Sequence, residues 1–223
     1  MQLWSVKLKN KAVFFSKKCC GKVMMRGQEM TNMNNMKKEG CKALLVYYSK
    51  TGFTQKYAEW IKEALPQDIS CDLVPYKERG KLKWEQYDLI LFGGGFHAGM
   101  INGLKWFKAQ AGRLPEQIRQ GGRTAVFATG AMPVDAPDVE KAMRQNFTEQ
   151  EWAQIKTFYL PGGLCYERMG IGDKLMMSVF KAMLKESKVD SRIQQIVASS
   201  HDITSKEAII PIVEWCSAVS RSM

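Results

Sequence analysis

The sequence contains no apolar run of the roughly 18–20 residues that a membrane-spanning helix needs. It also lacks the apolar core of a signal peptide near its start, where a short run at residues 12–15 is followed by a serine and two lysines. These absences argue against a helical membrane protein and a secreted one. We therefore expect the protein to stay in the cytoplasm.

The sequence has few residues of the types that usually act as nucleophiles or metal ligands. The 223 residues include two histidines, and the six cysteines form no CxxC pair and show no zinc-ligand spacing. No Ser-His-Asp, Cys-His or metal-ligand arrangement stands out, which disfavours nucleophilic catalysis and a metal site. In a reducing cytoplasm the cysteines are expected to be free thiols.

The charge of the chain is unevenly distributed. Thirty-three basic and 22 acidic residues give a net charge of +11, which favours an anionic partner. Residues 1–40 hold nine of the basic and two of the acidic residues, so this segment carries +7 and the remaining 183 residues carry +4. The basic character therefore belongs mostly to the first 40 residues.

Residues 1–40 show no sustained helix or strand period. We predict a disordered basic extension here, and a single folded domain over residues 41–223. One alternative is a stretch read from an early start codon, with Met24, Met30 or Met36 as later starts. Another is a basic arm for lipid headgroups or nucleic acid; a nucleic-acid arm predicts salt-dependent binding that is lost when residues 1–36 are deleted. We favour the extension without nucleic-acid binding.

Apolar runs of strand length alternate with helical patterns from residue 42 onward. The first run, residues 43–48, is apolar throughout, as expected for a parallel strand buried on both faces. Pro75 indicates that the second strand lies at a sheet edge. Later strands are predicted at residues 71–76, 89–92, 124–128 and 157–160, and helices between Thr54 and Pro66 and at 103–112, 138–146, 173–186 and 205–220. The alternation predicts an α/β fold, a doubly wound five-stranded parallel sheet with helices on both faces.

Three loops of this fold are candidates for a ligand site. In open parallel sheets, ligands bind beyond the carboxyl ends of the strands, near the point where the strand order reverses. This rule selects residues 49–54, 93–100 and 129–134, which follow the first, third and fourth predicted strands.

The loop at residues 49–54 has the composition of a phosphate site. Three hydroxyl residues surround a glycine, and the loop leads into a helix whose first amides are unpaired and whose dipole end is positive. It matches neither GxxxxGK[ST] nor GxGxxG, which disfavours a nucleoside triphosphate or NAD bound in those ways. The alternative is a tight turn with Thr51 or Thr54 as the helix N-cap. The candidate cofactor-binding residues here are Ser49, Lys50, Thr51, Gly52, Phe53 and Thr54.

The run LVYYSKTGFT at residues 45–54 resembles the first strand and FMN phosphate loop of the flavodoxin family. That loop reads hydroxyl residue, any residue, Thr, Gly, any residue, Thr. The run YDLILFG at residues 87–93 resembles the third strand of the same family. The resemblance implies a flavodoxin-like sheet of order 2-1-3-4-5, with FMN bound where the order reverses.

The chain resembles more closely the menaquinone-dependent protoporphyrinogen oxidase branch of that family, over residues 42–220. The carrying features are the phosphate loop, WEQYD at residues 84–88, GGLCY at residues 162–166 and KLMMSVFK at residues 174–181. This resemblance implies oxidation of protoporphyrinogen IX with a quinone as acceptor. The glycine-rich run at residues 93–96 and the extension over residues 1–40 depart from that branch.

By the same resemblance, the other two loops border the flavin. Consecutive glycines let a chain run close beneath a planar ring, and the amides of the later loop would tune the flavin's redox potential. The candidates are Gly94, Gly95, Phe96 and His97, followed by Thr129, Gly130 and Ala131. The alternatives are a glycine loop whose Phe96 caps the core, a structural His97, and an ordinary strand-to-helix connection. His97 is the one candidate for a catalytic role.

Residues 171–188 form a basic amphipathic pattern. Apolar residues recur at helical spacing from Ile171 to Leu184, and lysines from Lys174 to Lys188 line the polar side. Such a helix can lie on an anionic bilayer, which would place the protein peripherally at the inner face of the membrane. We favour the alternative that the helix packs on the sheet, because a doubly wound sheet needs helices on both faces.

We expect an FMN-dependent oxidoreductase or electron-transfer protein, in which the flavin carries the electrons. Its expected partners are a redox protein or a quinone. The alternative is a non-catalytic flavodoxin-type carrier between partner proteins. Typical carriers of that family are acidic, whereas residues 41–223 carry +4. A mildly basic domain suits an acidic substrate such as a porphyrinogen with propionate groups.

Overall fold

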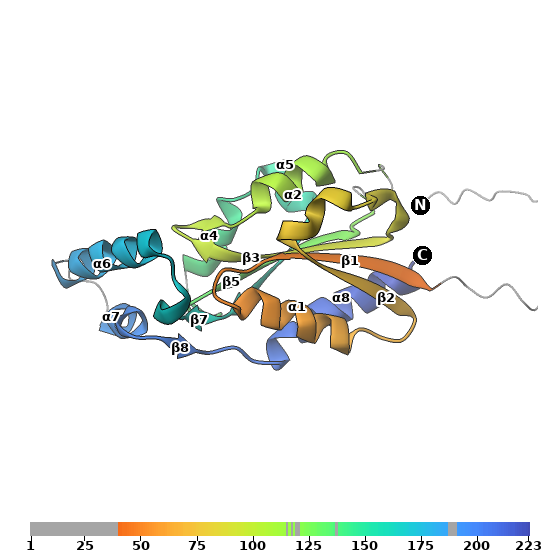
Figure 1. Ribbon diagram of the computed structural model, residues 1–223. Helices are drawn as coiled ribbons and strands as arrows, with labels where there is room; N and C mark the ends of the chain where they lie inside the picture. The colour runs from red at the N-terminus through yellow and green to blue at the C-terminus, as the bar shows by residue number, and fades with distance from the viewer. Residues whose placement is uncertain (1–39, 115, 117, 119–120, 137, 187–190) are drawn as a thin grey trace, which may run out of the picture. The chain divides into compact units, whose positions relative to one another are not determined.

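Five parallel strands form the centre of the fold. The computed structural model describes residues 40–114, 116, 118, 121–136, 138–186 and 191–223 (Figure 1). The strands are β1 (Cys41–Tyr48), β2 (Ile69–Pro75), β3 (Leu89–His97), β5 (Thr124–Gly130) and β6 (Lys156–Pro161). They pair in the order β2-β1-β3-β5-β6, with every neighbouring pair parallel. Counted among themselves, these strands follow the predicted order 2-1-3-4-5, so the predicted fold class is confirmed.

Helices cover both faces of the sheet. One face carries α1 (Phe53–Ala64) and α8 (Ile210–Arg221), and the other carries α2 (Leu104–Ala111), α4 (Asp138–Arg144) and α5 (Glu149–Gln154). Short 3-10 helices occur at η1 (Tyr76–Lys81), η2 (Trp84–Gln86) and η4 (Glu207–Ile209). The chain therefore has the three layers that the alternating pattern predicted.

Strand β1 shows how the sheet is buried on both faces. Ala43 and Leu45 pack in the cluster that includes α1 and α8, whereas Leu44 and Val46 pack in the cluster that includes α2. All four side chains are fully buried. Two-sided burial requires apolar residues at consecutive positions, which is why the run reads as continuously hydrophobic. Strand β2 lies at the sheet edge, as Pro75 indicated.

The prediction that the third strand ends at the glycine run is wrong. Strand β3 continues through Gly93–Gly95 to His97 and then pairs antiparallel with β4 (Met100–Ile101). A Cβ on Gly93 would lie 2.2 Å from the Phe127 ring, and one on Gly94 would lie 2.7 Å from the Ile101 side chain. These two glycines therefore leave room for neighbouring side chains of the sheet and the hairpin.

One helix boundary differs from expectation, and one helix was not predicted. The last helix was predicted at residues 205–220, but α8 begins at Ile210 after the η4 turn, with Pro211 in its first turn. Proline favours the start of a helix because its missing N–H would be unpaired there anyway. Helix α5 was not predicted, although it opens with a capping box between Thr148 and Glu151.

The chain after β6 builds a small segment beyond the end of the sheet (Figure 1). It contains β7 (Gly163–Leu164), η3 (Tyr166–Arg168), α6 (Ile171–Glu186), α7 (Ser191–Ala198) and β8 (His201–Asp202). Strand β7 pairs antiparallel with β8, and α6 packs on α7, which was not predicted.

The favoured expectation that α6 packs its apolar face on the sheet is wrong. Six of its large apolar side chains are exposed, from 38% for Met176 to 89% for Ile171. The others are Leu175, Val179, Phe180 and Met183. The faces of the sheet are already covered by the helices named above, so α6 lies beyond the strand ends.

Three further expectations concern the chain as a whole. Among the residues that the structure describes, no helix is both long and apolar enough to cross a membrane. The four cysteines in this part, Cys41, Cys71, Cys165 and Cys216, are free, as predicted. The predicted basic extension lies outside the described residues apart from Gly40, as do Cys19 and Cys20. The described residues between 40 and 223 form one compact unit.

Candidate functional site

The turn between β1 and α1 presents the start of a helix at the carboxyl edge of the sheet. Gly52 caps α1 with a φ of 102°, a left-handed conformation that glycine adopts without strain. The Ser49 hydroxyl accepts a hydrogen bond from the Gly52 amide at 3.1 Å. The first intrahelical bond runs from the Lys56 amide to the Gly52 carbonyl at 2.9 Å, so the preceding amides of α1 have no acceptor within the helix.

The alternative that Thr51 or Thr54 caps this helix is wrong. The N-cap is Gly52, and the Thr54 hydroxyl points into the protein instead. It lies 2.8 Å from the Thr129 hydroxyl at the end of β5, and both residues are buried. A hydroxyl pair thus joins two of the three predicted loops.

The β3–β4 hairpin supplies the second loop. Phe96 and His97 are half-buried at the end of β3, and the chain reverses through Ala98 and Gly99, both with positive φ. The Phe96 ring lies 6.0 Å from the Tyr159 ring on β6. The hairpin therefore presents an aromatic face and an imidazole at the same sheet edge as the α1 turn.

The end of β5 supplies the third loop. The Gly130 carbonyl accepts a hydrogen bond from the Gly162 amide at 2.7 Å, and the Tyr159 hydroxyl donates to the Met132 carbonyl at 2.8 Å. Burial raises the pKa of the Tyr159 hydroxyl, which keeps it protonated as a donor. The backbone of this loop is thereby fixed from the side of β6.

A cavity of about 180 Å³ lies where these loops meet. Nine of the thirteen predicted residues line it: Lys50, Thr51, Phe53, Gly95, Phe96, His97, Thr129, Gly130 and Ala131. Four do not, namely Ser49, Gly52, Thr54 and Gly94. Ser49 and Gly52 shape the turn, Thr54 is the buried strut described above, and Gly94 packs against the hairpin.

The rest of the lining comes from the chain after β6, which was not among the predicted site residues. These residues are Gly162, Gly163, Leu164, Cys165, Met169, Asp173, Met176 and Met177, together with Ala98 and Asn102 of the hairpin. A signal was present, because the fifth predicted strand also ends in a glycine pair at the same sheet edge. The three predicted loops thus form three sides of the cavity, and the chain after β6, including α6, forms the fourth.

Asp173 connects α6 to two of the predicted loops. Its carboxylate lies 2.8 Å from the His97 Nε2 atom and 3.4 Å from the Lys50 Nζ atom. Partial burial raises the pKa of Asp173, but the hydrogen bond from His97 and the charge of Lys50 outweigh it and hold this pKa below 3.8. Asp173 is therefore an ionised carboxylate at the cavity wall.

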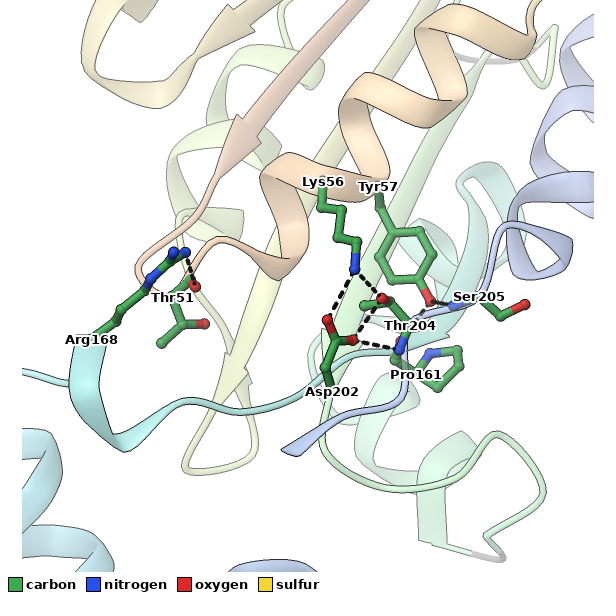
Figure 2. A network of polar contacts seen from close by, with 8 residues as sticks. All are labelled: Thr51, Lys56, Tyr57, Pro161, Arg168, Asp202, Thr204 and Ser205. Carbon is green, nitrogen blue, oxygen red and sulfur yellow. Dashed lines mark hydrogen bonds and ion pairs between the residues drawn. The ribbon is translucent and has the colours of Figure 1, made fainter. Parts of the chain in front are cut away.

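Further polar contacts hold the segment after β6 to helix α1 (Figure 2). The Arg168 guanidinium donates to the Thr51 carbonyl at 3.2 Å, and Lys56 pairs with Asp202 at 2.9 Å. The Tyr57 hydroxyl donates to the Pro161 carbonyl at 2.6 Å and accepts from the Ser205 amide at 3.0 Å. Both ends of the segment are thus bound to the helix that begins at the candidate phosphate loop.

A larger hollow of about 430 Å³ lies between α1 and α8. Its lining comes from the sides of these helices and from η4, including Trp60, Lys206 and Val213. Ligands of doubly wound sheets bind at the strand ends, where backbone amides and loops converge. The cavity under α6 is therefore the better candidate site.

The sheet order and the position of this cavity define a doubly wound α/β protein with a site at the carboxyl edge. A family model described as flavodoxin domain matches residues 44–191, which is more than half of the chain. The protein therefore belongs to the flavodoxin domain family. A search of curated proteins finds no match.

Three solved structures illustrate what this chain is similar to. An archaeal flavodoxin is 15% identical, with a TM-score of 0.34, over 63% of this chain and 97% of its own. A flavoprotein from Lactobacillus acidophilus, solved with FMN, is 20% identical, with a TM-score of 0.35, over 55% and 93%. The Flv1 flavodiiron core from Synechocystis is 10% identical, with a TM-score of 0.43, over 83% of this chain and 38% of that core.

Proposed function

We propose that this protein is an oxidoreductase that binds FMN in the cavity under α6. The observation that carries the proposal is the meeting of three strand-end loops and an open helix N-terminus in one cavity, in a chain of the flavodoxin domain family. Such an edge combines an anion site with loops that can flank a planar ring.

The residues of the cavity fit the two parts of FMN. Lys50, Thr51 and the first amides of α1 offer a cation, a hydroxyl and unpaired donors for the phosphate. Phe53, Phe96 and the methionines of α6 supply apolar surface for a planar ring. A Cβ on Gly95 would lie 3.7 Å from the Thr54 and Thr129 hydroxyls, an ordinary contact distance, so this glycine lines the cavity directly beside that pair.

FMN, when bound, supplies the electron chemistry by accepting and releasing one or two electrons. The chain's own contribution is binding, orientation and exclusion of water. The α1 turn would hold the anionic end, and the β5 loop offers backbone amides to the polar edge of the ring. His97 lies at the cavity wall, where its Nε2 atom is 2.8 Å from the Asp173 carboxylate.

The reaction that we propose for this site is the oxidation of protoporphyrinogen IX with a quinone as the electron acceptor. Its support is the resemblance at residues 84–88, 162–166 and 174–181, together with the methionine-rich wall of the cavity. Cations near the site suit a substrate that carries propionates. The second candidate is an electron carrier without its own substrate, for which the partner would be a redox protein.

We also propose that the exposed face of α6 rests on an anionic bilayer, which would give the site access to a lipid-soluble acceptor. Six large apolar side chains are exposed on this helix, and Lys174 is exposed beside them. The one acidic residue whose side chain is described on α6, Asp173, faces the cavity. This arrangement is that of an interfacial helix with cationic flanks.

The proposed function is tested first by the absorbance of the purified protein. We expect a yellow protein that releases FMN on denaturation; a colourless protein that fails to take up added FMN would overturn the proposal. Turnover of protoporphyrinogen with a menaquinone analogue then separates the candidates. Lack of turnover in flavin-loaded protein, combined with rapid reduction by a flavodoxin reductase, would favour the carrier.

A further inference from the structure

The cavity under α6 is too small for the ligand that we propose. Its volume is about 180 Å³, whereas pockets for ligands of this size measure about 300–1,000 Å³. The wall that closes it consists of residues 163–186, which include β7, η3 and α6. Entry of a flavin therefore requires part of this wall to move.

Apolar packing gives α6 little hold on the body of the protein. Among its side chains that the structure describes, Leu184 is buried, and most of the apolar ones face outward. Its helical neighbour is α7, which belongs to the same segment. A helix with so little buried apolar surface gains little stability from docking on the core.

Polar contacts instead hold the start of α6 against the loop after β1 and the β3–β4 hairpin. Asp173 reaches His97 at 2.8 Å and Lys50 at 3.4 Å, and Arg168 reaches the Thr51 carbonyl at 3.2 Å. Asp173 is 22% exposed, so its contacts are partly shielded from water. The contact with His97 is the shorter of the two that Asp173 makes.

We propose that residues 163–186 form a lid over the cavity and that Asp173 is the positioning residue that latches it shut. The latch is a contact within this chain, so it can be tested without a ligand. That the lid admits FMN rests on the proposed function. In the open state Asp173 separates from His97, and the wall formed by Met169, Met176 and Met177 moves away from the three loops.

The first test is amide hydrogen exchange in the full chain without added flavin. Asp173→Asn should raise exchange across residues 174–180 about tenfold, the effect of losing one hydrogen bond to a charged group. Exchange across α1 should stay unchanged. The matched control is Glu149→Gln, which removes an exposed carboxylate that pairs with Arg144 at 2.6 Å, outside the cavity lining. Unchanged exchange in Asp173→Asn would overturn the latch.

A double-mutant cycle separates the latch from a simple helix-end effect. Asp173 lies in the first turn of α6, where any carboxylate favours the helix dipole. If Asp173 acts through the two loops, Asp173→Asn should have little further effect in a chain that already carries His97→Gln and Lys50→Met. A full-sized effect in that background would assign Asp173 to the helix end and overturn the proposal.

The second test measures how fast FMN enters and leaves. A weakened lid should raise the association and dissociation rate constants together, each about tenfold, while the dissociation constant changes little. Asp173→Glu should restore much of the slow exchange. Faster dissociation with unchanged association would indicate a damaged site and contradict the lid. If FMN does not bind at all, the proposed function fails, and hydrogen exchange still decides whether the latch exists.

Discussion

The hydroxyl groups of Thr54 and Thr129 lie 2.8 Å apart although 75 residues separate them in the chain. One opens helix α1 and the other ends β5, and both are buried. The pair fixes the distance between the candidate phosphate loop and the loop that follows β5. The two hydroxyls satisfy each other, so the pair stabilises the site from below.

Thr54→Val should lower the free energy of unfolding by about 1–3 kcal/mol, because it leaves the Thr129 hydroxyl buried without a partner. Thr54→Val/Thr129→Val should be closer to the native protein than either single variant, since both partners are then apolar. Urea denaturation measures all three chains. A double variant as unstable as the sum of the singles would show that the pair does not act as a unit.

Thr51→Ala should weaken FMN binding about tenfold with little change in stability, because Thr51 lines the cavity whereas Thr54 does not. Fluorescence titration of the refolded protein with FMN gives the affinity. Thr54→Val serves as the comparison, since its effect should appear mainly as lost stability. If both variants lost affinity equally, the contact with the phosphate could not be assigned to Thr51 in preference to Thr54.

Gly93→Ala should lower the free energy of unfolding by about 1–3 kcal/mol through overpacking. Its Cβ would lie 2.2 Å from the Phe127 ring in the middle of the sheet. Gly80→Ala is the matched control, because no atom lies within 4 Å of the Cβ there. Thermal unfolding compares the two, and similar melting temperatures would contradict the packing argument.

The lid should loosen in acid. Its latch needs an ionised Asp173, whose pKa is lowered below the ordinary 3.8, chiefly by His97 and Lys50 against the opposing effect of burial. The stability that ionised Asp173 gives to the latch is therefore complete above the ordinary pKa of an aspartate, and it is lost as the pH falls through the lowered pKa of Asp173. Protection of α6 amides should fall between about pH 5 and about pH 2. Asp173→Asn should show a smaller change over this range, and an equal change would point to another group.

Leu175→Glu/Val179→Glu should abolish binding to vesicles of phosphatidylcholine and phosphatidylglycerol, because both side chains are more than half exposed on α6. Ile210→Glu is the control, since this isoleucine is 51% exposed on α8. Sedimentation with the FMN-loaded protein measures binding. The proposal that α6 rests on a bilayer would be contradicted if the native protein did not bind the vesicles. It would also be contradicted if the variant lost a dimer and kept its vesicle binding.

The order of strands and helices could be predicted from the sequence because burial on both faces leaves a local pattern. Residues 43–48 are apolar at consecutive positions, and the helices show their own spacing. The glycine run was misplaced because its cause is not local. Whether Gly93 ends a strand or makes room inside one depends on Phe127, which lies on a neighbouring strand.

The sequence by itself determined the class of fold, the loop at residues 49–54 and the sheet edge at which the candidate cavity lies, since each depends on neighbouring residues and on general rules of chain direction. Only the tertiary structure decided which hydroxyls face the cavity, that Thr54 is a buried strut, and that α6 leaves its apolar face in the open. It also brought Asp173 to Lys50 and His97. Contacts between residues far apart in the chain leave no period in the sequence, so they emerge only when the strands assemble.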